Sequence, residues 1–433
     1  MSPHKKPVVI IGAGMSGLGA AIRLLETGYQ CVLLEAAPEA GGLAGSFKVK
    51  KKYFPLGSHH ILSQDKPLIA TLKKLGFYPR VAWKKGKVLF AIDGRMYDLQ
   101  NPLEFVKFPM RFIDKLRFIK LIMYCMLKKN WNADLGDAQL WIDRIASPPV
   151  REVIFDPLID IKYGLPANHV SANWLGSRLH YQEFSKPLGY IPGENWTRVL
   201  TEILVQKVKD LGGTIITNAA VQKVIFANNT FREVTYQHHE VSRILTGDIL
   251  INTAPPHIFL ALSGYRGRVL EKVEYLDALS VVLETKQKLP REFYLLSCLK
   301  PRYSFGGIFM LSALNETIGT GNNQVLNFFT TLSPAYEYLR NKSPEELLAC
   351  YQKDFKKLFG FLLEPLWSHR TLITNYSPRF LKQYENVDHR GSVRGLYFAG
   401  NYMTYPIITS TGSAIESGEA AAKCIIEDYQ KSL

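Results

Sequence analysis

The chain has few cysteines and no long hydrophobic run. Its 433 residues include five cysteines, and no two of them stand in a Cys-x-x-Cys pattern. This scarcity excludes a disulfide scaffold and a cysteine-based zinc site, and it indicates a reducing compartment. No apolar run is long enough to cross a bilayer. The first predicted strand begins at Val8, which leaves no room for a signal peptide, so we expect a cytoplasmic protein.

Several motifs that carry chemistry are also missing. No histidines and carboxylates stand at metal-ligand spacing, so no metal is predicted, and no Gly-x-Ser-x-Gly nucleophile elbow occurs. The net charge is +15, but no motif that reads nucleic acid accompanies it, so we expect no nucleic-acid partner. The sequence does not indicate the oligomeric state. These absences leave cofactor chemistry on a small molecule as the class of function to examine.

A glycine-rich turn follows the first predicted strand. Four consecutive β-branched residues, 8–11, predict a buried parallel strand. Gly12, Gly14 and Gly17 follow with G-x-G-x-x-G spacing, and an amphipathic helix then runs to Gly28. The spacing permits a tight turn, a close approach of the backbone to a pyrophosphate, and close packing of the helix on the sheet. The alternative interpretation is a glycine-rich turn that only joins a strand to a helix.

The second predicted strand, residues 31–34, ends at Glu35. A carboxylate in this place can accept both hydroxyl groups of an adenosine ribose, while the N-terminus of the preceding helix holds the phosphates. It also argues against a 2′-phosphate, which would favour a nearby arginine. The order of strand, glycines, helix, strand and acid therefore favours dinucleotide binding over a plain turn.

Two further segments indicate which dinucleotide is bound. Residues 35–47 contain Gly41-Gly42, and residues 395–401 predict a strand that ends in glycine and asparagine before a final helix. Both segments resemble those of the flavin amine oxidase superfamily, which includes monoamine oxidases, protoporphyrinogen oxidases and phytoene desaturases. The resemblance implies FAD, with the second glycine pair beside the pyrophosphate, although Leu43 replaces the usual arginine. It also implies that the N-terminus of the final helix stabilises negative charge on the reduced flavin ring.

The resemblance implies a fold as well. We expect an α/β protein in which a Rossmann-like FAD-binding domain is interleaved with an α+β substrate domain that carries a helical insertion. The FAD-binding domain is predicted at residues 1–85, 187–262 and 391–433. The substrate domain is predicted at 86–186 and 263–390, with the mainly helical insertion at 101–186. Between these parts, residues 214–216 and 221–225 alternate like paired strands.

The resemblance also transfers a set of cofactor contacts to this sequence. One of them is a backbone group at Val221, which is expected on the adenine. No cysteine lies between Gly400 and Ser413, so we expect FAD to be held non-covalently. The predicted contacts are Gly12, Gly14, Met15, Ser16, Gly17, Glu35, Ala36, Gly41, Gly42, Leu43, Gly57, Ser58, Val221, Gly400, Asn401, Thr409, Ser410 and Thr411.

Two adjacent histidines, His59 and His60, follow the second glycine pair. The resemblance places this segment close to the flavin ring, and a similar Gly-x-His stretch occurs in UDP-galactopyranose mutases. One histidine is therefore the predicted catalytic group, which hydrogen-bonds flavin or substrate or moves a proton. Adjacent residues of an extended chain point to opposite faces, so only one of the two is expected to face the ring. The alternative is that both are structural.

Two departures from monoamine oxidases bear on the substrate. Ser410 stands in place of an amine-orienting tyrosine, and Ser280 in place of the lysine near flavin N5. The resemblance therefore disfavours an amine and implies an FAD-dependent oxidoreductase that moves a hydride from an apolar substrate to flavin N5. One alternative is a redox-neutral flavoenzyme, either like UDP-galactopyranose mutase or a polyene isomerase. A second alternative is a non-catalytic FAD-binding partner protein.

Much of the positive charge lies in residues 84–131, which hold eleven Lys/Arg and four Asp/Glu. Asn101-Pro102 predicts a helix start, and Pro109 predicts a kink or a restart. Apolar residues recur at three- and four-residue steps, and Lys107, Arg111, Asp114 and Lys115 lie on the opposite face. One interpretation is a surface helix whose apolar face belongs to the core. The other is contact of residues 103–129 with an anionic membrane surface, on the inner face of a membrane.

Overall fold

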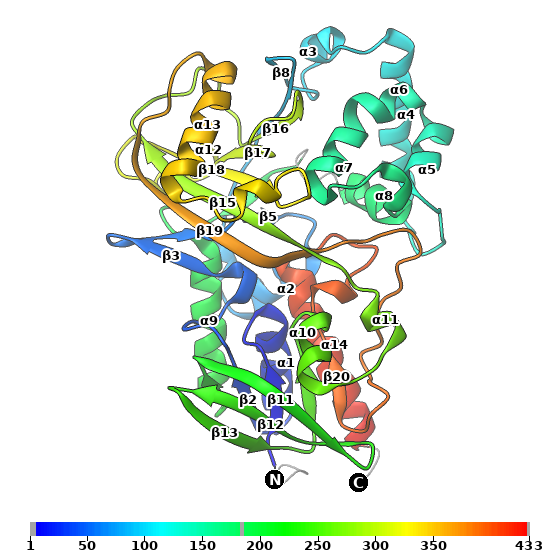
Figure 1. Ribbon diagram of the computed structural model, residues 1–433, viewed down its shortest axis with the longest axis vertical. Helices are drawn as coiled ribbons and strands as arrows, with labels where there is room; N and C mark the ends of the chain where they lie inside the picture. The colour runs from blue at the N-terminus through cyan, green and yellow to red at the C-terminus, as the bar shows by residue number, and fades with distance from the viewer. Residues whose placement is uncertain (1–5, 182–185, 431–433) are drawn as a thin grey trace.

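The computed structural model describes residues 6–181 and 186–430, and Figure 1 shows two halves with both chain ends in the lower one. The lower half is built on a parallel sheet in the order β10-β2-β1-β14-β20. Its strands are β1 (Val8–Ile11), β2 (Cys31–Leu34), β10 (Thr214–Ile216), β14 (Leu250–Asn252) and β20 (Leu396–Phe398). This sheet confirms the predicted Rossmann-like α/β fold.

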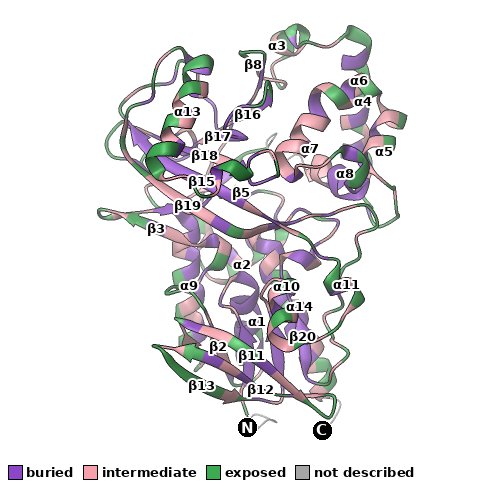
Figure 2. Cartoon of the chain, viewed as in Figure 1, coloured by how far each residue is buried: buried purple, intermediate pink, exposed green. Residues whose placement is uncertain are grey.

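The central strand β1 is buried on both faces because every one of its side chains is apolar. Val8 and Ile10 belong to one core, with helices, and Val9 and Ile11 belong to another, with a small antiparallel sheet. The helices of the first core are α1 (Met15–Leu25), α2 (Lys66–Lys74), α9 (Trp196–Asp210) and α14 (Thr411–Gln430). The second core includes β11 (Ala219–Ala227), β12 (Thr230–His238), β13 (Val241–Thr246), α10 (Pro256–Ser263) and α11 (Arg268–Glu271). Figure 2 shows α1 as almost entirely buried.

One predicted strand pairing is wrong. β10 does not pair with β11; it is an edge strand of the parallel sheet, where Ile215 pairs with Leu33 of β2. β11 pairs instead with β12. A short apolar run indicates a strand but not its partner, which depends on segments far away in the sequence.

The upper half contains a mixed sheet in the order β19-β15-β18-β17-β16-β7-β8. The helix α13 (Pro344–Phe359) begins with a capping box formed by Ser343 and Glu346, and it packs against the same apolar core as this sheet. The strands are β7 (Val88–Ile92), β8 (Arg95–Tyr97), β15 (Tyr275–Thr285), β16 (Leu295–Lys300), β17 (Gly307–Met310), β18 (Gln324–Thr331) and β19 (Pro365–Pro378), and α12 (Leu311–Leu314) follows β17.

The remaining short strands form two small sheets, β3-β4 and β5-β9-β6. They are β3 (Ser46–Val49), β4 (Lys52–Pro55), β5 (Ile61–Leu62), β6 (Ala82–Lys84) and β9 (Leu188–Tyr190). Short 3-10 turns are η1 (Gly42–Ala44), η2 (Tyr78–Arg80), η4 (Ala167–His169), η5 (Glu337–Leu339) and η6 (Asn401–Met403).

A group of helices extends from the mixed sheet on the right of Figure 1. It consists of α3 (Pro102–Lys107), α4 (Phe112–Leu127), α5 (Ala138–Ile145), α6 (Pro148–Val150), a π-helical turn (Arg151–Phe155), α7 (Asp156–Tyr163) and α8 (Ala172–Tyr181). The interruption between α3 and α4 includes Pro109, so the predicted restart is confirmed. Within the described residues, no helix combines the length and the apolar character needed to cross a membrane.

The orientation of α4 contradicts the interpretation that its apolar face belongs to the core. Phe112, Leu116 and Met123 are exposed, whereas Asp114 and Lys115, predicted on the solvated face, are buried. The sequence pattern predicts an apolar and a polar face of α4. The hydrogen bonds of Asp114 with Ser147 and of Lys115 with the Val106 carbonyl hold the polar face inward.

Candidate active site

The glycine-rich turn occupies the carboxyl end of β1. Gly12 has a φ of +96°, and a Cβ atom there would lie 2.6 Å from Oγ1 of Thr253, which follows β14. A Cβ on Gly17 would lie 2.1 Å from the carbonyl oxygen of Gly12, so only glycine lets α1 pack this closely on the strand. Met15 and Ser16, in the first turn of α1, are buried. The structure therefore confirms two predicted features, the tight turn at Gly12 and the close packing of the helix at Gly17.

The Gly41-Gly42 pair lies directly against the glycine-rich turn. Gly14 and Gly41 form a parallel backbone bridge, and the Gly41 N–H donates to the Ala13 carbonyl at 2.9 Å. A Cβ built on Gly42 would lie 3.3 Å from Cα of Gly14. Gly14 is the N-cap of α1 and supplies no side-chain cap. Two stretches of bare backbone thus meet at an uncapped helix N-terminus, which suits a phosphate group.

Glu35 connects the glycine turn to the end of β2. Its Oε2 accepts from the Ala13 N–H at 2.7 Å, and its Oε1 accepts from the Ala37 N–H at 2.9 Å. The Glu35 carbonyl accepts from the Ala219 N–H at 2.8 Å, so the first residue of β11, the strand that carries Val221, is bonded to the end of β2. A carboxylate has about four lone-pair sites, so these two bonds leave acceptor capacity for ribose hydroxyl groups.

The C-terminal segment meets the same edge of the parallel sheet. The Gly400 N–H donates to Oγ of Ser417 on α14 at 3.0 Å, and the Ala399 N–H donates to the Asn252 carbonyl at 3.0 Å. The Tyr275 hydroxyl donates to Oδ1 of Asn401 at 2.5 Å, and burial raises the pKa of Tyr275 well above 10, so this donor stays protonated. Tyr275, which the sequence did not indicate, therefore orients the predicted contact Asn401.

The N-terminus of α14 holds three of the predicted contacts, Thr409, Ser410 and Thr411. Ser410 and Ser413 cap each other: each hydroxyl oxygen accepts from the other residue's N–H, at 3.0 and 2.8 Å. One more partner is Asp65, which the sequence did not indicate. Its Oδ2 accepts from the Gly412 N–H at 3.3 Å, and its Oδ1 accepts from the N–H of Leu68, in α2, at 3.1 Å.

Asp65 is buried, and burial raises the pKa of its carboxyl group above 3.8. A Cβ on Gly412 would lie 2.0 Å from Oδ1 of Asp65, so glycine is required there for the two helices to share this carboxylate. The Asp-Lys-Pro sequence indicates the cap of α2. The sequence around Asp65 does not indicate that the same carboxylate also accepts from Gly412 of α14.

The loop that contains Gly57 and Ser58 carries both predicted catalytic histidines. His59 Nε2 lies 3.0 Å from the Leu43 carbonyl, and burial lowers the pKa of His59 to about 4, so the ring is neutral at pH 7 and Nε2 donates. This contact ties the histidine loop to the second glycine pair and favours the structural alternative for His59. His60 differs, because its Nδ1 lies 2.9 Å from the Tyr294 hydroxyl in the upper half.

A chain of buried hydrogen bonds lies beyond Ser58. Oγ of Ser58 accepts from Nδ2 of Asn327 at 3.2 Å, and Oδ1 of Asn327 accepts from the Ser280 hydroxyl at 3.0 Å. Ser280 and Asn327 are fully buried on β15 and β18. Ser280, which stands in place of a lysine of amine oxidases, is therefore a small neutral group that is hydrogen-bonded inside the sheet.

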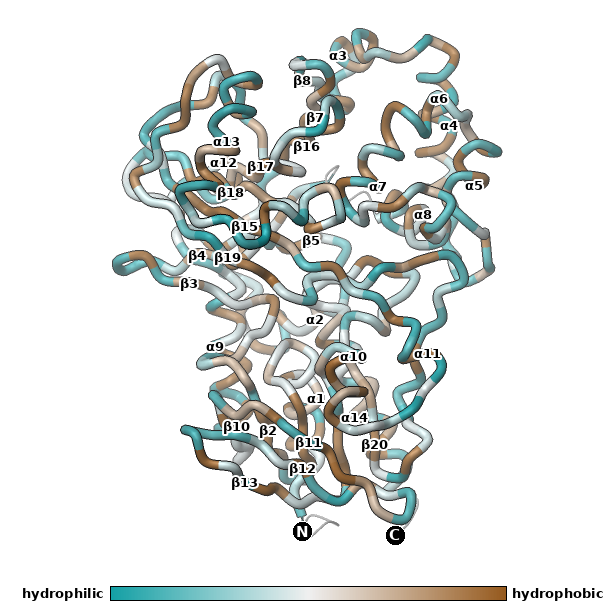
Figure 3. Tube along the Cα trace, in the orientation of Figure 1, coloured by the Kyte–Doolittle hydropathy of each residue, from teal (hydrophilic) through white to brown (hydrophobic). Residues whose placement is uncertain are grey.

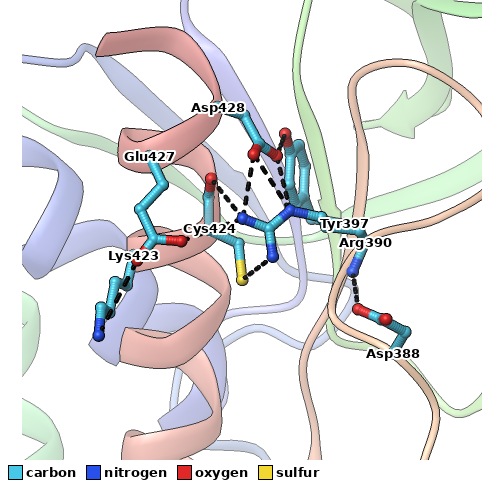
Figure 4. Close-up of polar contacts among 7 residues, drawn as sticks. All are labelled: Asp388, Arg390, Tyr397, Lys423, Cys424, Glu427 and Asp428. Atoms are coloured by element: carbon cyan, nitrogen blue, oxygen red, sulfur yellow. Dashed lines mark hydrogen bonds and ion pairs between the residues drawn. The ribbon is translucent and has the colours of Figure 1, made fainter. Parts of the chain in front are cut away.

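Two other kinds of site receive no support from the described part of the chain. Across residues 6–181 and 186–430, no three His, Cys, Asp or Glu side chains gather in a way that could hold a metal ion. Figure 4 shows a polar cluster in which Arg390 pairs with Asp428 and lies 3.2 Å from the Cys424 sulfur. Burial raises the pKa of Cys424, so the cluster does not activate the thiol. The ion pair of Arg390 with Asp428 joins the end of α14 to the segment before β20.

Comparison with known proteins places these features in a family. Residues 15–426 match the family Flavin containing amine oxidoreductase. The 15-cis-phytoene desaturase of an Oncidium hybrid cultivar is 23% identical over 475 residues, which cover 99% of this chain and 79% of the relative.

Two solved structures share the fold. A putative protoporphyrinogen oxidase from Exiguobacterium sp. 255-15 superposes with a TM-score of 0.77 at 15% identity, covering 98% of this chain and 99% of that one. Reduced UDP-galactopyranose mutase gives a TM-score of 0.74 at 14% identity, covering 98% and 96%. Since the family match extends over nearly the whole chain, the protein belongs to the flavin-containing amine oxidoreductase family and is an enzyme of that oxidoreductase class.

Proposed function

We propose that the protein is an FAD-dependent oxidoreductase that takes a hydride from an apolar substrate and holds FAD non-covalently. The observation that carries the cofactor proposal is the contact of Gly14 with the Gly41-Gly42 pair at the uncapped N-terminus of α1. When bound, FAD supplies the hydride acceptor, and the protein supplies position, exclusion of water and charge stabilisation.

The residues fit FAD at three places. The backbone at Gly14 and Gly42 would bind the pyrophosphate, and Glu35 would accept the ribose hydroxyls. Asn401, oriented by Tyr275, would contact the segment between phosphate and ring. Each of these groups lies at or near the edge where the parallel strands end, which is the usual place for a ligand in such sheets.

Two observations support an apolar substrate over an amine. Ser280 and Asn327 pair with each other inside the sheet, so neither presents a charged or flexible group for an amine. Ser410 is engaged with Ser413 at the start of α14. The name of the plant relative, a desaturase, supports dehydrogenation as the reaction class.

Anaerobic reduction of the purified protein tests this proposal. We expect its visible flavin absorbance to bleach with an isoprenoid or tetrapyrrole substrate and to persist with a primary amine. Bleaching by the amine alone would contradict the apolar assignment. Turnover of UDP-galactopyranose only after prior flavin reduction, with no net electron transfer, would contradict the oxidoreductase assignment and favour the redox-neutral alternative.

A further inference from the structure

The outward surface of α3 and α4 exposes an unusual amount of apolar side chain. Leu103, Phe112 and Leu127 are 74%, 75% and 77% exposed. Figure 2 shows α3 largely exposed, and Figure 3 shows hydrophobic and hydrophilic residues together on it. The exposed apolar residues of this surface, which we call the α3–α4 face, are Leu103, Val106, Phe112, Ile113, Leu116, Ile119, Met123, Met126 and Leu127.

The charges around the α3–α4 face are of one sign. Neither of its two carboxylates is free at the surface: Asp114 is buried and accepts from Arg111 at 2.8 Å, and the partly exposed Glu104 pairs with Arg291 at 2.6 Å. Lys107, Lys120 and Lys129 are exposed. Residues 102–129 therefore present apolar and cationic groups to solvent without a free carboxylate.

Buried polar contacts hold α4 in this orientation. Nζ of Lys115 donates to the Val106 carbonyl of α3 at 2.5 Å, and the Ser147 hydroxyl donates to Oδ1 of Asp114 at 3.0 Å. On the same inward side, Leu121 and Cys125 are fully buried in the helical core. Turning the apolar face inward would break these contacts and bury new charges, so its exposure is a fixed property of the fold.

Large exposed apolar patches on a monomer mark interaction surfaces. A second copy of the chain would bring two cationic rims against each other, which like-charge repulsion opposes. An anionic bilayer matches both properties, since its acyl boundary accepts apolar side chains while its phosphates attract lysine and arginine. We infer that the α3–α4 face docks the protein on a bilayer surface that contains anionic lipid.

Vesicle co-flotation of the purified full-length protein tests this inference. We expect binding to vesicles of phosphatidylcholine with phosphatidylglycerol, much weaker binding to phosphatidylcholine alone, and loss of binding as salt shortens the Debye length. The triple variant Lys107→Glu, Lys120→Glu, Lys129→Glu should bind anionic vesicles at least tenfold more weakly. Its matched control, Lys209→Glu, Lys353→Glu, Lys356→Glu, makes the same charge change at exposed lysines elsewhere and should keep wild-type binding.

A second variant tests the apolar part of the α3–α4 face. Phe112→Ser with Leu116→Ser keeps every charge, replaces exposed side chains, and should weaken binding at least tenfold without lowering the melting temperature. Three results would overturn the inference: no binding of the wild type to anionic vesicles, equal losses in the lysine variant and its control, or a concentration-dependent dimer that the serine variant dissociates. The last result would assign the face to a second copy.

Discussion

At the scale of single residues, neighbouring positions make different contacts. His59 and His60 are adjacent, yet His59 bonds the backbone of the lower half at Leu43, and His60 reaches Tyr294 of the upper half. Their separation follows from the alternation of an extended segment. His60 is therefore the better candidate for contact with substrate, and His59 is a connection between two loops.

The lowered pKa of His59 predicts a pH dependence of stability. The folded protein keeps the ring neutral down to about pH 4, whereas the unfolded chain takes up a proton near pH 6.5. His59 therefore stabilises the fold above pH 6.5, and this contribution falls as pH decreases from 6.5 towards 4. Between pH 7.5 and 5.5 the loss should be about 1 kcal/mol, and smaller in His59→Gln. Urea unfolding of the wild type and of His59→Gln at both pH values measures this loss. An equal change in the free energy of unfolding in the two proteins would contradict the prediction.

We expect substitutions at Gly14 and Gly17 to have different effects, one on flavin binding and the other on stability. A Cβ on Gly14 has its nearest contact 3.9 Å away at Gly42, so Gly14→Val should fold normally but block the phosphate position and lower flavin content at least tenfold. A Cβ on Gly17 would collide with the Gly12 carbonyl, so Gly17→Ala should lower the free energy of unfolding by more than about 1 kcal/mol. Measuring flavin content and urea unfolding for both variants distinguishes the two effects. Normal flavin content in Gly14→Val would refute the assignment of Gly14 to the phosphate site.

At the scale of elements, one carboxylate joins two helices. Asp65 accepts N–H groups of α2 and α14, whereas Asp137 caps α5 alone through Leu140. A single cap is worth about 1 kcal/mol, so Asp65→Ala should destabilise the protein by about 2 kcal/mol and Asp137→Ala by about 1 kcal/mol. Urea unfolding of both variants tests this difference; equal losses would show that the contact of Asp65 with α14 contributes nothing.

The raised pKa of Asp65 gives an independent check. The unfolded carboxyl ionises near pH 3.8, and the folded one ionises at a higher pH. Ionisation of Asp65 therefore lowers stability as pH rises from 3.8 through the folded pKa. Asp65→Asn keeps an acceptor oxygen and removes the buried charge, so at pH 7 it should be at least as stable as the wild type. A marked loss of stability in Asp65→Asn would contradict this account.

What the sequence could predict differs between elements for a physical reason. The turn from β1 through Gly12 to α1 was predictable because a local pattern determines it, and so was the restart at Pro109. The partner of β10 and the reach of Asp65 to Gly412 depend on segments brought together only by the whole fold. The faces of α4 were predictable, but their orientation was not, because it depends on Ser147 and on the carbonyl of Val106.

At the scale of the whole molecule, the two halves share a boundary built from distant parts of the chain. The edge of the parallel sheet carries Gly14, Glu35 and Asn401, and the histidine loop reaches from it to Tyr294 and Asn327 of the upper half. The α3–α4 face lies at the end of the molecule remote from both termini (Figure 1). The proposed cofactor site and the proposed membrane surface are therefore separate, and either can fail without the other.

The visible absorption spectrum of the purified protein is the most direct test of whether the chain binds FAD. Because Gly14, Gly42, Glu35 and Asn401 lie at or near one edge of the parallel sheet, we expect a flavin spectrum, with FAD released intact into solution on denaturation. Release under denaturing conditions also tests non-covalent binding. A colourless protein that cannot be reconstituted with added FAD would show that the glycine-rich turn and Glu35 do not form an FAD site.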